Sequence, residues 1–304
     1  MIQYPTRTSV ISRLMRMKYP SWQNDAIEQT NQFRTAGHFI KKGDMLPNNE
    51  KCKEFWGDVK RVFITVQHDK CAFCEKSLEE SLIEWDLEHF RPKSEVTEWK
   101  LPCANGRDLT QRNFHLKPRA THWEYQYPTG LPMSEGYYLL TYNLENYVAS
   151  CKTCNSVYKR TYFPIKNGRV AGGDTIAAHD SEGAYLIYPL GDYGENPEDF
   201  LQFEGVQAKA KNGSLRGQLL IDFFDLNRES LQFSRANWLL HTFRPTYDAF
   251  QANILSGSET MEYLLSHKAP YTNCTRCFME LCIKDFNAAN QQYRIMKRIL
   301  KKYP

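Results

Sequence analysis

The sequence predicts an α+β fold that is mainly helical and contains a small unit braced by zinc. Two observations predict this class. Apolar residues recur at helical spacing before about residue 67 and again after about residue 215. Between these stretches lie two Cys-x-x-Cys pairs, Cys71 with Cys74 and Cys151 with Cys154, which supply enough thiolates for one tetrahedral zinc site.

The composition is that of a globular protein with 304 residues, of which 41% are hydrophobic. No stretch approaches the ~20 apolar residues of a membrane span, and the first twenty residues lack the apolar core of a secretory signal. The odd number of nine cysteines favours reduced thiols and metal binding over disulfides, so we expect a cytoplasmic protein. A net charge of +4 is compatible with nucleic acid as a partner without requiring it.

The N-terminal region, residues 1–67, is expected to be helical, because apolar residues follow a helical spacing in most of it. The Pro-Asn-Asn sequence at 47–49 should interrupt the helices. Residues 55–66 carry apolar residues at helical spacing. The run at 60–67 is also rich in β-branched residues, so a strand at the end of this region is the alternative.

The middle region, residues 68–165, is expected to form the zinc-braced core. Residues 83–89 alternate apolar and polar side chains, which is typical of a half-buried strand. A second apolar run at 137–148 leads into the second cysteine pair, and a short helix should follow at 155–162. Residues 94–136, with four prolines and several aromatic residues, should form a long insertion without a packed element.

The C-terminal region, residues 166–304, should begin as a turn-rich or small β segment and continue as helices from residue 215. Cys274, Cys277 and Cys282, with His267 nearby, leave a second zinc site open. The alternative, which the amphipathic surroundings favour, is a set of buried thiols in a helix. We expect the helices at 215–224, 228–243, 247–255, 260–266 and 274–302.

The four paired cysteines are predicted to hold a structural zinc ion. Zinc binds thiolates in a tetrahedron, and the Cys-x-x-Cys spacing gives two ligands from one turn. A zinc ion with four thiolate ligands has no open position, so its part would be structural. The simpler alternative is two unrelated pairs of buried thiols.

A Glu-His dipeptide at the end of the predicted strand is the candidate reaction centre. Neighbours on a strand point to opposite faces, so Glu88 can face a metal ion while His89 faces a water molecule. A histidine suits the task of a general base near neutral pH, although a lone strand histidine is more often structural. Asn155 offers an amide oxygen to Mg²⁺ or Mn²⁺, or else caps a helix.

These motifs resemble those of HNH endonucleases. The resemblance covers about residues 68–165 and rests on the two Cys-x-x-Cys pairs, Glu-His-Phe-Arg-Pro-Lys at 88–93, Asn146, and Asn155 followed by Lys159. More narrowly, the pattern is similar to the PtuB-type nucleases of Septu anti-phage defence and some retron systems, with a weaker match at 217–235. It implies a ββα-metal core and metal-dependent hydrolysis of phosphodiester bonds, with DNA favoured over RNA.

The resemblance also implies roles for single residues. His89 would be the general base, and Asn146 would hold its imidazole through a hydrogen bond. Glu88 and Asn155 would hold the catalytic Mg²⁺ or Mn²⁺. Lys159 would meet the scissile phosphate or its neighbour.

Two features depart from the family pattern. The span from His89 to Asn146 is much longer than in a minimal motif, and Asn143 competes with Asn146 for the orienting role. Glutamate also stands at position 88 where many members carry aspartate or histidine, which lengthens this ligand by one methylene.

The partners predicted for the chain are nucleic acid and, by resemblance, an ATPase of the PtuA type that gates the nuclease. The predicted path for the phosphate backbone runs along five basic residues: Arg91, Lys93, Arg112, Lys117 and Arg119. The alternative is that these residues form an ordinary solvated surface. The rival function is a zinc-ribbon nucleic-acid-binding or adaptor protein without catalysis. It would keep the four cysteines but would not need Glu88, His89, Asn146 and Asn155 together.

Overall fold

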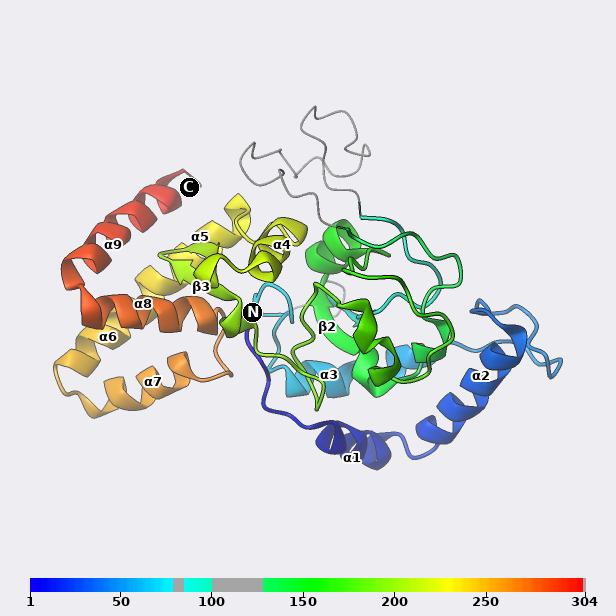
Figure 1. Cartoon of the computed structure of the whole chain (residues 1–304). Helices are drawn as coiled ribbons and strands as arrows, with labels where there is room; N and C mark the ends of the chain where they lie inside the picture. The colour runs from blue at the N-terminus through cyan, green and yellow to red at the C-terminus, as the bar shows by residue number, and fades with distance from the viewer. Residues whose placement is uncertain (79–84, 100–127, 303–304) are drawn as a thin grey trace. The chain divides into compact units, whose positions relative to one another are not determined.

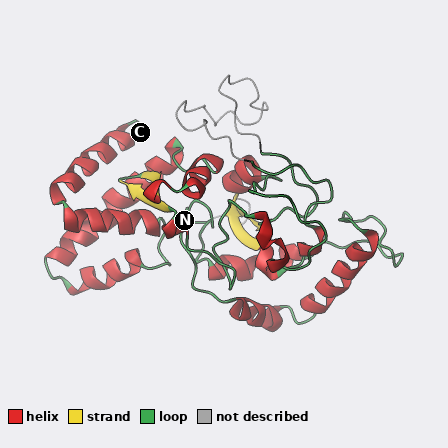
Figure 2. Cartoon of the chain, viewed as in Figure 1, coloured by secondary structure: helices red, strands yellow, loops and turns green. Residues whose placement is uncertain are grey.

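A computed structural model describes residues 1–78, 85–99 and 128–302 (Figure 1). The chain divides into two compact units, one of residues 1–3, 70–79 and 196–304 and the other of residues 4–69 and 80–195. Helices and loops make up most of the described chain, together with two small antiparallel sheets (Figure 2). The predicted α+β class is therefore confirmed, whereas the division at residues 67 and 165 stays a prediction.

The unit of residues 4–69 and 80–195 is built around the strands β1 and β2. β1 (Trp85–His89) pairs antiparallel with β2 (Tyr147–Cys151), in a register that places His89 opposite Tyr147. Both strands are almost wholly buried. The remaining elements of this unit are α1 (Thr8–Lys18), α2 (Trp22–Ala36), η1 (Trp56–Val59), α3 (Lys60–Val66), η2 (Tyr138–Leu140), η3 (Leu144–Asn146), the π-helix η4 (Thr153–Lys159) and η5 (Ala177–Glu182).

The segment at 60–67, for which a strand was the alternative, is the helix α3, as the helical spacing of its apolar residues predicts. Its buried residues include Val62, Phe63 and Val66, which share one face of a helix. Tertiary packing thus outweighs the strand preference of the β-branched residues. Gln67 directly follows α3, and its amide group accepts from the Ala149 N–H at 2.7 Å and donates to the Ala149 carbonyl at 2.9 Å. This amide pair satisfies the outer edge of β2.

The second unit is mainly helical. A hairpin of β3 (Leu201–Glu204) and β4 (Gln207–Ala210) precedes its α-helices. The expected single helix at 274–302 is two helices, because Asp285 interrupts it and caps the second through the Ala288 N–H. The other elements are η6 (Pro197–Asp199), η7 (Lys211–Gly213), α4 (Leu215–Phe223), α5 (Glu229–Trp238), η8 (Leu239–Phe243), α6 (Arg244–Gln251), α7 (Leu255–Leu265), α8 (Thr272–Lys284) and α9 (Phe286–Lys301).

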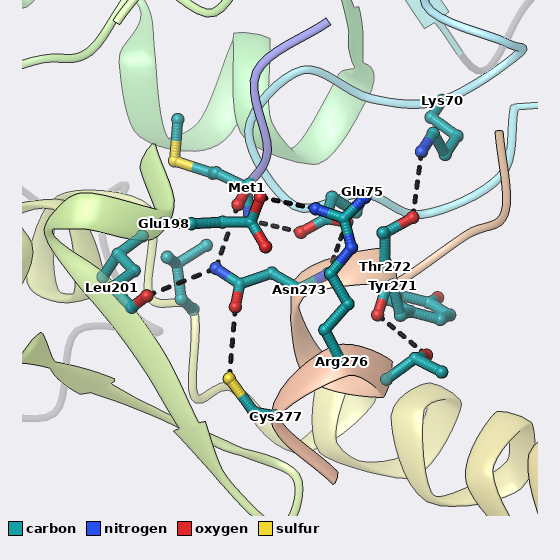
Figure 3. Close-up of polar contacts among 12 residues, drawn as sticks. Met1, Lys70, Glu75, Glu198, Leu201, Tyr271, Thr272, Asn273, Arg276 and Cys277 are labelled. Atoms are coloured by element: carbon teal, nitrogen blue, oxygen red, sulfur yellow. Dashed lines mark hydrogen bonds and ion pairs between the residues drawn. The ribbon is translucent and has the colours of Figure 1, made fainter. Parts of the chain in front are cut away.

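The segment that carries the first cysteine pair is fixed within this unit by buried polar contacts (Figure 3). Lys70 donates to the Ala269 carbonyl at 2.8 Å, and Glu75 accepts from the Asn273 N–H. Asn273 in turn donates to the Leu201 carbonyl. Burial lowers the pKa of Lys70 to about 8, against the effect of the Glu75 carboxylate. Phe73, between the two cysteines, stacks on the ring of Phe224 in the same unit, with the ring centres 4.3 Å apart.

The described ends of the predicted insertion are joined by a short bridge. Val96 and Met133 exchange two backbone hydrogen bonds, of 2.8 and 2.9 Å. Residues 100–127, which include Arg112, Lys117 and Arg119, lie outside the described residues. In the described part of the chain, no helix combines the length and the apolar character that crossing a bilayer requires.

Candidate metal and reaction site

The sulfur atoms of the two Cys-x-x-Cys pairs lie within 4.8 Å of one another, and all four residues are buried. A tetrahedron with Zn–S bonds of ~2.3 Å has edges of roughly 3.8 Å, so the spacing fits one ion with four thiolates. Cys71 and Cys74 lie on a turn, Cys151 ends β2, and Cys154 lies in the π-helix η4. The predicted cluster is formed and could hold zinc.

The third Cys-x-x-Cys pair lies within helix α8 and joins no such cluster among the described residues. The Cys274 thiol donates to the Gly205 carbonyl at 3.3 Å, and the Cys277 thiol donates to the Asn273 side chain. Burial raises the pKa of Cys274 to about 12, so the thiol form dominates at neutral pH. These observations favour buried thiols over a second zinc site.

His89 lies at the end of β1 and is only 6% exposed. Its ring packs edge-to-face against the rings of Trp56 and Tyr147, with ring centres 5.2 and 5.0 Å away. Its Nε2 lies 3.0 Å from the Thr141 carbonyl, and a carbonyl can only accept, so Nε2 carries the proton. The lone pair of the neutral ring is therefore on Nδ1. Burial, together with the charge of Lys93, lowers the pKa of His89 well below its usual value.

Glu88, beside His89, forms an ion pair with Lys159. The Lys159 ammonium lies 2.6 Å from Glu88 Oε1, and the two side chains are 0% and 12% exposed. Burial raises the pKa of Glu88, and the charge of Lys159 opposes this shift. The π-helix η4 brings Lys159 back to β1, since the two residues are 71 positions apart. Lys159, expected to contact a phosphate, is thus already paired with the expected metal ligand.

Asn146 is fully buried at the end of η3, directly before β2, but it does not hold the imidazole as expected. Its side-chain oxygen accepts from the Arg91 N–H at 2.7 Å, and its amide donates to the carbonyls of Arg91 and Leu140. These bonds extend the β1–β2 ladder beyond His89 through a side chain. The Thr141 carbonyl takes the partner position on His89 instead. The competing Asn143 caps the turn before Asn146 through the Glu145 N–H.

Asn155 lies inside the π-helix η4, whose N-cap is Lys152, so it does not act as the helix cap. It is half-buried, and in the described part of the chain its amide group makes no hydrogen bond. Its oxygen is therefore available to a ligand, as the sequence suggested. Its backbone carbonyl accepts from the Arg160 N–H at 2.7 Å.

The two basic residues of the Phe-Arg-Pro-Lys stretch are less exposed than residues that line an open path for phosphates would be. Arg91 is 4% exposed, and its guanidinium forms an ion pair with the buried Glu182 and stacks on the ring of Phe163. The Arg91 guanidinium is therefore engaged by contacts inside the unit. Lys93 is half-buried, with its ammonium 4.4 Å from the centre of the Trp56 ring. Burial lowers the pKa of Lys93, against the charges of nearby carboxylates.

Three residues that shape this site carried no signal in the sequence. Thr141 acts through its backbone carbonyl, a group that every residue has. Trp56 reaches His89 from η1, 33 positions earlier, and its contact depends on tertiary packing. Gln67 supports β2 in the same way. A pattern of local spacing could not have identified these contacts.

Comparison with known proteins gives one informative similarity. The chain is 26% identical over 211 residues to the Septu protein PtuB of Bacillus mycoides (strain KBAB4), and the alignment covers 69% of the chain. The alignment spans 59% of the length of this relative. No protein-family model and no solved structure matches the chain. The similarity supports a relationship with the Septu-type defence family.

Proposed function

We propose that the chain is a metal-dependent HNH endonuclease that hydrolyses phosphodiester bonds, with DNA as the favoured substrate. The observation that carries this proposal is the state of His89, a neutral imidazole whose Nε2–H is held by the Thr141 carbonyl. Such a ring is fixed in one tautomer, with Nδ1 as the atom that takes the proton from water. The low pKa keeps it in the basic form at neutral pH.

The residues near His89 fit a divalent ion best when a phosphate binds with it. Glu88 is a single carboxylate whose charge Lys159 already balances, and Lys93 adds a second positive charge nearby. A carboxylate has lone pairs for both a lysine and a metal ion. Mg²⁺ in proteins is commonly held by one or two carboxylates, water and substrate phosphate.

In this proposal Glu88 and Asn155 hold the ion, while Lys159 and Lys93 attract the phosphate. The ion, when bound, supplies charge stabilisation for the leaving oxygen. Asn146 positions the end of β1 through its three backbone hydrogen bonds, so its effect on catalysis is indirect. The cysteine cluster would hold a structural zinc ion that orders the cysteine turns.

The biological setting we propose is anti-phage defence of the Septu type. The similarity to a Septu PtuB protein supports this setting, as does the motif resemblance. An ATPase of the PtuA type would then be the partner that restrains the nuclease. Co-purification of the chain with the product of a neighbouring ATPase gene, and loss of cleavage control without it, are the expected observations.

The test is a cleavage assay on plasmid DNA and on RNA with Mg²⁺, Mn²⁺ or EDTA. We expect cleavage with a divalent ion and a fall of about 10²–10⁴ in rate for His89→Ala, the range for loss of a general base. His241→Ala is the matched control, because His241 is an exposed histidine in the other unit. Equal rates for His89→Ala and the control would remove the proposal.

A second measurement separates the metal ion from the rest of the proposal. Mn²⁺ binding to His89→Ala should be weak alone and tighter with an oligonucleotide, because phosphate supplies further ligands. Elemental analysis should find one zinc ion per chain. Cleavage that persists in EDTA without loss of rate would contradict the role of the divalent ion. Nucleic-acid binding with no cleavage under any condition would favour the adaptor function.

A further inference from the structure

A cationic groove lies along helix α9 in the C-terminal unit, far along the chain from His89. Its volume is about 640 Å³. The side chains that line it are Arg244 from α6 and, from α9, Asn287, Asn290, Gln291, Arg294 and Lys297, with Tyr293 beside them. This lining contains three cations and three amides, and no carboxylate belongs to it.

The cations of this groove are largely unneutralised. Arg294 and Lys297 are exposed, and neither side chain makes a hydrogen bond or an ion pair with any described residue. Arg244 is held in place by stacking, with its guanidinium 4.5 Å from the centre of the Tyr293 ring. Its ion pair with Asp248 is long, at 3.9 Å, and the Asp248 side chain is 63% exposed. The groove thus presents a net positive charge, and one of its three cations, Arg244, is held in place by the Tyr293 ring.

The spacing along α9 places these groups in one row. Asn287, Asn290, Arg294 and Lys297 are separated by three, four and three residues, which keeps them on one face of the helix. The row spans ten residues, or roughly 15 Å at 1.5 Å per residue. One strand of duplex DNA advances about 3.4 Å per nucleotide, so the row can follow several successive phosphates.

The chemistry of the lining favours a phosphate backbone over a protein surface. Lysine, arginine and amide side chains are the usual donors to phosphate oxygens. Protein interfaces have apolar and aromatic cores, whereas nucleic-acid interfaces are more polar and more positive. The one aromatic residue of the lining, Tyr293, is 3% exposed and lies under Arg244, so it offers little apolar surface.

We propose that the α9 groove binds the phosphodiester backbone of nucleic acid, as a binding site separate from the reaction centre at His89. It would hold the substrate through salt-dependent contacts and read no sequence. The inference rests on the proposed function only in taking nucleic acid as what this chain acts on. The basic end of α9 is then more than a complement to the helix dipole.

The test compares two double charge reversals of α9 in the full-length protein. Arg294→Glu/Lys297→Glu changes two groove cations, and Arg298→Glu/Lys301→Glu makes the same change in net charge outside the lining. Binding of a labelled 20-nucleotide strand and of the matching duplex is measured by anisotropy between about 50 and 200 mM salt, without added divalent ion.

We expect the groove variant to lose at least about tenfold in affinity, and its duplex salt slope to fall by about 2, near 0.9 for each lost phosphate contact. The control should change affinity by less than about threefold, since it lacks the groove geometry. Equal losses in the two variants would reduce the effect to net charge and overturn the inference. Unchanged binding by the groove variant, or no binding by the wild type, would overturn it too.

Folding and function are separated by two further readouts. All four substituted residues are exposed, so thermal unfolding should change little. If Arg294→Glu/Lys297→Glu is poorly folded, Arg294→Gln/Lys297→Gln replaces it, because this variant adds no negative charge. It should show the same reduction in salt slope. Groove-dependent binding without any cleavage would leave the groove in place and remove the nuclease. Cleavage together with groove-independent binding would do the reverse.

Discussion

Two positively charged side chains next to β1, Arg91 and Lys159, are buried and paired with carboxylates. Arg294 and Lys297 of the α9 groove are instead exposed, and their side chains form no ion pair with any described residue. Arg91 is paired with Glu182 and Lys159 with Glu88, and three of these four side chains are at most 5% exposed. In the groove, Arg294 and Lys297 are exposed, and no carboxylate belongs to the lining. The two regions therefore use the same residue types for different physical purposes.

The difference follows from the cost of removing a charge from water. A buried ion needs a partner in a fixed place, so its pair sets local geometry and adds little net stability. An exposed cation loses little by remaining unpaired and is free to exchange counterions for a ligand. Burial thus separates the cations that set the geometry of the reaction centre from the exposed cations that can bind a polyanion elsewhere on the protein.

The largest effect should come from breaking the Arg91–Glu182 pair. Glu182→Gln leaves the Arg91 guanidinium buried without a counter-charge, so we expect a loss of about 3–5 kcal/mol in the free energy of unfolding. Chemical denaturation measures it. Glu182 also accepts from the Val170 N–H and lies 3.5 Å from His179 Nδ1, so the loss should reach beyond one contact. A loss below about 1 kcal/mol would contradict the view that this pair supports the unit.

The same pair predicts a dependence on acid. Burial opposes ionisation of Glu182, but the charge of Arg91 and the hydrogen bond from the Val170 N–H outweigh it and lower its pKa from the usual value. A carboxyl group with a lowered pKa stabilises the fold above its unfolded value, and this stabilisation is lost as the pH falls through the folded value. The wild type should therefore lose stability below about pH 4.5 more steeply than Glu182→Gln. Parallel pH profiles of the two proteins would contradict this assignment.

A smaller effect is expected for the coupling between Glu88 and Lys159. The variants Glu88→Gln, Lys159→Met and the double variant form a thermodynamic cycle, for which we expect a coupling of about 0.5–3 kcal/mol. The double variant should be more stable than the sum of the single changes predicts, because it leaves no buried charge alone. Unfolding of all four proteins at one pH gives the value. Additive losses would show that the two groups act independently.

The parts of the site that could be predicted from the sequence depend on local spacing. The two Cys-x-x-Cys pairs gave the four-thiolate cluster because each pair supplies two ligands from one turn. The alternation at 83–89 predicted the strand that carries His89. The parts that could not be predicted depend on contacts between distant segments. Lys159 reaches Glu88 from 71 positions away, and Thr141 reaches His89 from 52.

The fold divides in the same way. Helices α4 and α5 begin within a residue of the expected positions, because their apolar pattern is local. For helix α3 the sequence left a strand as an alternative, because β-branched side chains favour strands, and packing of its apolar face against the rest of the unit decides for the helix. The expected hydrogen bond from Asn146 to His89 came from a motif resemblance. In the structure the side chain of Asn146 forms its hydrogen bonds with the backbone of Arg91 instead.

The smallest effect is expected for an ion pair that resembles the groove in exposure. Arg34 and Asp174 lie 2.9 Å apart, and their side chains are 47% and 54% exposed. Asp174→Asn should therefore change the free energy of unfolding by about 0–1 kcal/mol, and the change should shrink further at high salt. Chemical denaturation at two salt concentrations measures both. If Asp174→Asn lowers the free energy of unfolding as much as Glu182→Gln does, exposure does not distinguish ion pairs that contribute little to stability from those that contribute much. The expectation that the exposed cations of α9 can be reversed without unfolding the protein would then fail as well.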